Sequence, residues 1–207
     1  MLKRSIMTLC LLCIAGIAMA IEEPKYRVIE TSGAFELRVY DPKIIAEVEV
    51  TGSLRKASNK GFKLIADYIF GNNTSRSKLD SNEKISMTAP VTMKAQSEKV
   101  AMTAPVTMKQ TGETWNMHFV MPSSYTLATL PKPNNPAVKV RQLEGAKYAV
   151  IKFSGLAGKS VVDKKTALLE TWLRDKNIKA KGSPEIARYN PPWTLPFMRR
   201  NEVMVPY

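Results

Sequence analysis

Few residues of this 207-residue chain have side chains that could do chemistry. It contains one histidine, His118, and two cysteines, Cys10 and Cys13, which both lie near the N-terminus. Neither the H-E-x-x-H spacing of zinc proteases nor the G-x-S-x-G turn of serine hydrolases occurs. Glu47 and Glu49 would share one face of a strand, but acids two positions apart are typical of solvent-facing charges as well as of a carboxylate pair. These residue types favour a protein that is not an enzyme.

The first 20 residues have the order of a cleavable export signal. The basic start MLKR is followed by the apolar run 5–17 and then by Ala18-Met19-Ala20, a small-x-small cleavage site. The apolar run is shorter than the roughly 20 residues that a spanning helix needs. We therefore predict that residues 1–20 are removed and that the mature chain, without a transmembrane segment, begins at Ile21. The location would be outside the cytoplasm, and periplasmic if the source is bacterial.

Charge and cysteine content limit the partners of such a mature chain. Lysine and arginine total 31 and acids total 18, and the predicted leader removes two of the basic residues, so the mature net charge is +11. Without cysteine, a mature chain could form neither a disulfide nor a thiolate metal site. No zinc-finger spacing or RNA-binding aromatic motif occurs, so no nucleic-acid partner is expected. Anionic small ligands, an anionic envelope surface, or merely a solvated basic surface remain as interpretations.

The order of apolar segments indicates two similar halves. Residues 122–136 are rich in proline and asparagine and predict an irregular connection. On either side, a strand-like run that ends in glycine, 46–52 and then 149–155, precedes a helical pattern. The predicted organisation is a single domain over 21–207 with repeat halves of about 25–121 and 137–207.

Helices and strands follow from apolar periodicity. Helical spacing predicts one helix over about 53–70, with a basic outer face, and another over about 161–177. Ser160 and Asp163 would open the second helix as a capping box. Alternation of apolar residues predicts strands at 35–39, 45–50, 115–121, 138–140, 148–153 and 203–205. The fold class expected is α+β: a distorted antiparallel β-barrel built from two pseudo-symmetric halves, each flanked by one helix.

A nearly exact tandem copy lies within the first half. Residues 84–93 read KISMTAPVTM and residues 99–108 read KVAMTAPVTM. A turn at 95–98 would pair the copies as a hairpin, with Met87 opposite Val106. The proline of each copy would place that hairpin at a sheet edge. The methionines could pack in the core or line a ligand site, and one copy could also fill the strand position while the other loops out.

Three motifs together resemble the SOUL haem-binding protein family. They are KISMTAPVTM, then WNMHFVMPS, and finally YNPPWTLPFMRRNEV near the C-terminus. The similarity extends over about residues 26–205. It implies a distorted barrel of two repeats, similar in fold to the small-molecule-binding effector domains of transcription regulators. It also implies haem or another tetrapyrrole as the ligand, held in a shallow apolar groove beside the first helix and the loop before the last strand.

Carried onto this sequence, the resemblance implies two groups of haem contacts. Propionates would meet basic residues of the first helix and the C-terminal loop: Arg55, Lys56, Lys60, Lys63, Arg199 and Arg200. The macrocycle would lie on an apolar surface formed by Trp193, Leu195, Phe197 and Met198. Arginine, lysine and aromatic rings suit these two parts of haem. The alternative interpretations are a solvated basic helix face and a structural strand entry, in which Arg200 and Glu202 project to one face and pair with neighbours.

Iron would need an axial ligand, and His118 is the only histidine available. In a strand over 115–121, however, His118 points away from Trp115, Met117 and Phe119, so a role on the second face is the alternative. No histidine lies in or near the first helix, where some family members have one. Ligation by Tyr68 or by a repeat methionine, or binding without a protein ligand, also remains open.

The sequence therefore predicts an exported, non-enzymatic protein that binds haem or a related tetrapyrrole for buffering, transport or scavenging. The alternative is a basic interaction protein that binds anionic envelope components or another small amphipathic ligand.

Overall fold

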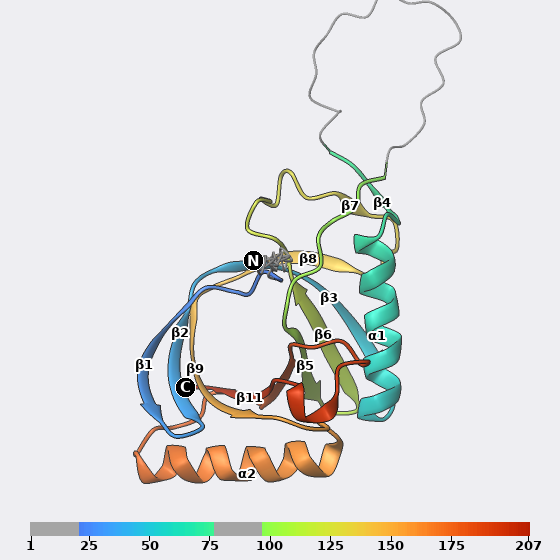
Figure 1. Cartoon of the computed structure of the whole chain (residues 1–207). Coiled ribbons are helices and arrows are strands. Elements are labelled where there is room, and N and C mark those ends of the chain that lie inside the picture. The colour runs from blue at the N-terminus through green and yellow to red at the C-terminus, as the bar shows by residue number, and fades with distance from the viewer. Residues whose placement is uncertain (1–20, 77–96) are drawn as a thin grey trace, which may run out of the picture.

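The computed structural model describes residues 21–76 and 97–207, and Figure 1 shows a large curled sheet flanked by two helices. The predicted export signal and the first copy of the tandem stretch lie outside these residues. Neighbouring strands of the main sheet are antiparallel. In spatial order they are β1 (Tyr26–Ser32), β2 (Phe35–Tyr40), β9 (Ala146–Phe153), β11 (Asn201–Pro206), β10 (Glu185–Arg188), β5 (Val106–Thr111), β6 (Thr114–Val120), β3 (Lys43–Thr51) and β8 (Lys139–Leu143). A small second sheet pairs β4 (Asn73–Thr74) with β7 (Lys132–Pro133).

The two helices cover the outer side of the curled sheet (Figure 1). Helix α1 (Leu54–Ile69) packs on β3 and β6, and α2 (Lys159–Asp175) packs on β9 and β11. The main hydrophobic core lies between these layers and includes Ile65, Phe119 and Leu169. This arrangement confirms the predicted α+β class with a distorted antiparallel barrel.

Helix α1 lies very close to β6 because it has a glycine at the contact. A Cβ atom on Gly61 would stand 2.8 Å from the Met117 sulfur and 3.3 Å from the Met117 Cβ. The helix begins as predicted, since the Ser53 hydroxyl accepts a hydrogen bond from the Lys56 amide at 3.5 Å. The position of α1, and so of its exposed residues, is thereby fixed relative to the sheet.

The predicted start of the second helix is wrong. Helix α2 begins at Lys159, Gly158 is its N-cap, and no side chain caps it. Ser160 therefore lies inside the first turn rather than at the cap. The Lys159 ammonium instead pairs with the Asp163 carboxylate at 2.7 Å, one turn along the helix.

The predicted edge hairpin is also wrong for the copy that the structure describes. Residues 97–105 are not a strand, and β5 begins only at Val106, directly after Pro105, which has no N–H to donate. Val106 pairs with Phe119 of β6 on one side and with Arg188 of β10 on the other. β5 lies in the interior of the sheet, whereas β1 and β8 form its edges.

Candidate functional site

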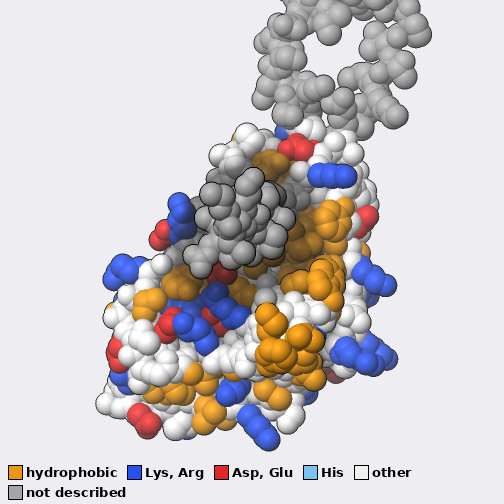
Figure 2. All heavy atoms as spheres, in the orientation of Figure 1, with side chains coloured by type: hydrophobic (Ala, Val, Ile, Leu, Met, Phe, Trp, Pro, Cys, Tyr) orange, Lys and Arg blue, Asp and Glu red, His pale blue; other side chains and the backbone are white. Residues whose placement is uncertain are grey.

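The loop between β10 and β11 exposes a group of large apolar side chains. Within it, Pro196–Met198 form a short 3-10 helix, η1. The exposed fractions are 82% for Trp193, 56% for Leu195, 73% for Phe197 and 62% for Met198. We call these four residues the apolar patch, and Figure 2 shows hydrophobic side chains gathered over η1 and along the flank of α1. Apolar groups so exposed and so close in sequence are typical of a surface that another molecule covers.

Backbone contacts hold the loop that carries the apolar patch. The Gly155 amide donates to the Pro196 carbonyl oxygen at 2.9 Å, and the Asn201 side-chain amide donates to the Gly155 carbonyl oxygen at 3.0 Å. Arg199 donates from Nε to the Thr194 carbonyl oxygen at 2.7 Å and from Nη2 to that of Pro192. The Arg199 guanidinium is therefore used mainly inside the loop.

Arg200 anchors the other end of the same loop. Its guanidinium donates to Glu202 Oε1 at 2.9 and 3.0 Å and to both carboxylate oxygens of Glu23 at 3.0 Å. It also stacks on the Tyr189 ring, with Cζ 3.7 Å from the ring centroid. Arg200 thus pairs with Glu202 and with Glu23, and these contacts keep the Arg200 charge at the base of the loop.

A buried ionic network lies under this base. Glu202 also accepts from Arg38 Nη1 and Nη2 at 2.9 and 3.1 Å and from the Tyr189 hydroxyl at 2.7 Å. Burial alone would raise the pKa of Glu202, but hydrogen bonds and the charge of Arg38 outweigh burial and lower that pKa. Glu36 closes the network from the far side of Arg38, with Nε to Oε2 at 2.7 Å. The apolar patch is thus carried on a rigid polar base.

Helix α1 carries four of the predicted basic residues, but not all on one side. Arg55, Lys56, Lys60 and Lys63 are all exposed. Phe62, 38% exposed, interrupts them and tilts against the Phe119 ring with centroids 5.6 Å apart.

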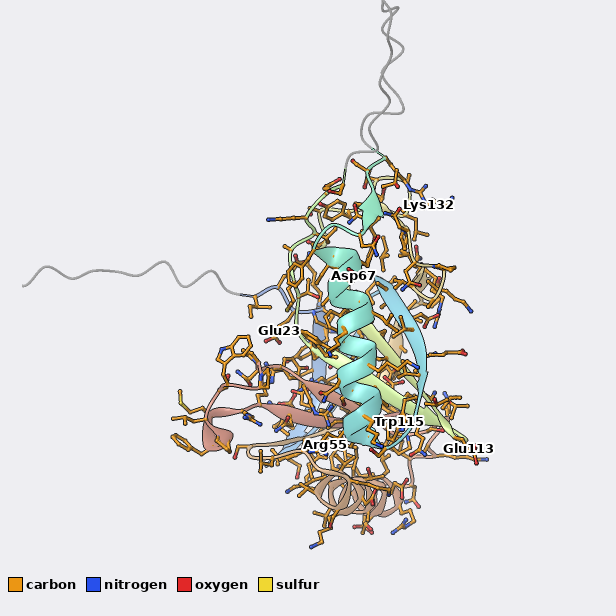
Figure 3. All side chains as sticks on the ribbon, turned by 90° about the vertical axis from the view of Figure 1, so that its right-hand side faces the viewer. Glu23, Arg55, Asp67, Glu113, Trp115 and Lys132 are labelled. Atoms are coloured by element: carbon orange, nitrogen blue, oxygen red, sulfur yellow. The ribbon has the colours of Figure 1, made fainter. Side chains whose placement is uncertain are left out.

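Only one of the four basic residues shares the face of Phe62. Arg55 precedes Phe62 by seven positions, so the two side chains point within about 20° of each other. Lys56, Lys60 and Lys63 point at least about 100° away from Phe62. Figure 3 shows Arg55 at the first turn of α1, level with the projecting η1 loop. Arg55 is thus the helix cation best placed beside an apolar ligand.

His118 lies on the inner face of the sheet, as its alternation with apolar neighbours predicted. It lines an internal cavity together with Asn116 and Val120, whereas Met117 and Phe119 belong to the core under α1. Burial lowers the pKa of His118 to about 3, and the positive charges of Lys43 and Arg141 act in the same direction. The sheet therefore lies between His118 and α1.

Two other candidate iron ligands, Tyr68 and Met108, are engaged elsewhere. Tyr68 is buried, its hydroxyl donates to the Pro131 carbonyl oxygen at 2.9 Å, and burial raises its pKa to about 12. Met108 is also buried, and its sulfur accepts from the Ser58 hydroxyl at 3.0 Å. Among the described residues, no group of three or more His, Cys, Asp or Glu side chains could hold a metal ion. Within the apolar patch, Met198 is the one side chain that can ligate iron.

Sequence reasoning missed two features of this region. Phe62 is an exposed aromatic residue between Lys60 and Lys63, and that break in a polar stretch was its signal. The second feature is the pair of charged residues Lys43 and Glu185, which line the cavity beside His118. No signal in the sequence could reveal this pair, because the two residues come from strands far apart in sequence.

Comparison with known proteins gives a family and a fold. A family model described as SOUL heme-binding protein matches residues 21–206. The C-terminal domain of EcmrR is similar in structure, with a TM-score of 0.54, 9% identity, and coverage of 87% of this chain and 96% of that domain. A hydrolase from Listeria innocua is similar with a TM-score of 0.53 and 11% identity, over 86% of this chain and 93% of that one. No curated protein matches the sequence. At such identities the structural similarities show the fold alone.

Proposed function

Because the chain belongs to the SOUL haem-binding protein family, we propose that it binds haem or a related tetrapyrrole on the apolar patch, beside α1. The observation that carries the proposal is the exposure of four large apolar side chains within six residues of the loop, on a family member. Covering one such side chain is worth about 1.5–3 kcal/mol. A flat macrocycle could cover several of them together.

The charges near the patch suit the propionates of haem. Arg55 offers a charged donor on the face of α1 that also carries Phe62, and Lys56 and Lys63 lie further round the helix. Arg199 and Arg200 keep the loop in place, so we assign them a positioning role rather than the main propionate contacts.

The iron has no strong protein ligand at this position. His118 faces the inner cavity, and Tyr68 is buried and hydrogen-bonded. The proposed mode is therefore binding through the macrocycle, with Met198 as the available thioether. Such binding suits buffering, transport or scavenging, and we propose no catalytic step.

We further propose that the protein acts outside the cytoplasm, after removal of residues 1–20. The order of basic, apolar and small residues in that segment supports this location. Among the described residues, no helix is long and apolar enough to cross a membrane.

The test is a hemin titration followed at the Soret band, in low and in high salt. We expect saturation at one equivalent in both, because apolar burial is less sensitive to ionic strength than surface charge. Trp193→Ser should weaken binding, while the control Leu168→Ser, at an apolar residue of α2 that is 51% exposed, should not. Binding that high salt abolishes would favour the alternative, a basic surface for anionic envelope components.

A further inference from the structure

The inner face of the sheet lines a partly open cavity that the proposed haem site does not use. Its volume is about 320 Å³, within the range of small-ligand pockets. Strands of the curled main sheet supply most of its lining residues. The helices α1 and α2 lie on the opposite, outer side of that sheet (Figure 1). None of the four apolar-patch residues lines it. The charged and polar groups in its wall determine what it could hold.

The walls carry one more positive than negative charge. Arg141 and Glu47 neutralise each other through two hydrogen bonds of 2.7 and 2.8 Å. Lys43, Lys109 and Glu185 remain. Glu185 accepts from the Tyr148 hydroxyl at 3.4 Å, and neither lysine forms a salt bridge with any described carboxylate. One partly buried cation is thus left without a compensating anion.

Burial already disfavours the charged forms of Lys43 and Glu185. It lowers the pKa of Lys43 and raises that of Glu185, because each charged form loses hydration. His118 stays neutral beside them, since its pKa is lowered to about 3. A bound anion would compensate the cationic excess and relieve the desolvation of Lys43.

The cavity also contains an acceptor in need of a donor. The side-chain oxygen of Asn116 is buried and has no hydrogen-bond partner among the described residues. Buried acceptors are almost always satisfied in folded proteins. Thr107 and Thr111 line the same cavity. A ligand with its own O–H or N–H donor would satisfy Asn116.

We propose that this cavity is a second ligand site, which binds a small organic anion with one negative charge and at least one hydroxyl donor. Lys43 and Lys109 would hold the anionic group, and Asn116 would accept from the hydroxyl. A hydroxycarboxylate has this chemistry, and a phosphate monoester would bring an extra charge that only one excess cation opposes. The site is independent of haem binding on the outer loop.

The single histidine of the chain reports on this site alone. We would follow the His118 ring resonances by NMR during titration with gluconate, and in parallel with glycerol 3-phosphate. A saturable shift with gluconate, at lower concentration than with the phosphate ester, is expected. If only the phosphate ester shifts His118, the proposed charge of the ligand is wrong. If neither probe does so, the site itself is refuted.

Two charge variants should move the affinity in opposite directions. Lys43→Met should weaken gluconate binding at least about tenfold, and Glu185→Gln should strengthen it, because one removes a cation and the other an anion. Lys60→Met, on the exposed face of α1, is the matched control and should bind as the wild type does. If Lys43→Met does not fold by circular dichroism, Lys109→Met takes its place. Equal affinities in the wild type and both charge variants would overturn the proposal.

Discussion

Replacing Glu202 by glutamine, which has nearly the same shape, should strongly lower the stability of the fold. Its side chain is fully buried, and it accepts hydrogen bonds from Arg38, Tyr189 and Arg200. Glu202→Gln would replace one carboxylate oxygen by an NH₂ group facing these donors. Arg38, itself 0% exposed, would keep only Glu36 as a charged partner.

The expected loss of stability is about 3–5 kcal/mol, the usual cost of removing one partner from a buried ion pair. For a protein of this size, the loss corresponds to a melting temperature lower by roughly 6–20 °C. The effect should depend on pH because the pKa of Glu202 is lowered in the folded state. The stabilisation is complete above the ordinary pKa of 4.5 and is lost as the pH falls through the folded-state value.

Urea unfolding, followed by circular dichroism at neutral pH and again in acid, measures both parts of this prediction. The difference between wild type and Glu202→Gln should be large at neutral pH and should shrink in acid. Glu49→Gln serves as the control, since Glu49 is exposed on β3. A neutral-pH loss below about 1 kcal/mol, or one that does not change with pH, would refute the assignment of Glu202 as the centre of the network.

Three further predictions follow from the geometry. Gly61→Val should lower the free energy of unfolding by about 1–3 kcal/mol, because the new side chain meets Met117, and unchanged stability in urea would contradict the close approach of α1. The His118 imidazole should stay neutral in NMR titrations until strongly acid pH, since its pKa is about 3; a midpoint near 6.5 would show an open, hydrated cavity. Arg55→Gln should weaken hemin binding roughly two- to fivefold, whereas Lys60→Gln should not. Equal effects of the two variants would show that the basic residues of α1 attract hemin without a specific contact.

Periodicity predicted the elements that bury one apolar side. Helix α1 and strands β3 and β6 show this clearly, because their core-facing residues recur with the period of a helix or a strand. Strand β10 has only four residues, EIAR, and is buried by its neighbours β5 and β11 rather than by its own alternation. A short strand with charged ends gives no periodic signal.

Pairing was harder to predict than element type. The tandem copy suggested a local hairpin, but Val106 pairs with Phe119 and with Arg188, which is far away in sequence. The Ser160 capping prediction failed because the helix begins two residues earlier, after Gly158. Local sequence signals, such as a repeat or a capping residue, did not predict these features, because packing between distant segments determines them.

The candidate site likewise combines residues that the sequence identified with contacts that only the structure shows. The residues of the apolar patch were identified from the resemblance to a family, and the structure shows them exposed together. That Arg199 and Arg200 hold the loop depends on contacts with Thr194 and Glu23, which no spacing in the sequence reveals. The internal cavity depends wholly on the curl of the sheet.

The central claim is that a tetrapyrrole binds on the outer loop and not at the only histidine. The most direct test is a hemin titration, at the Soret band, of wild type, His118→Ala and Phe197→Ser. We predict that His118→Ala keeps the wild-type affinity and spectrum, because His118 faces the inner cavity, and that Phe197→Ser binds at least about tenfold more weakly, since it loses a large apolar contact. Loss of the Soret shift in His118→Ala, with Phe197→Ser unchanged, would contradict this account.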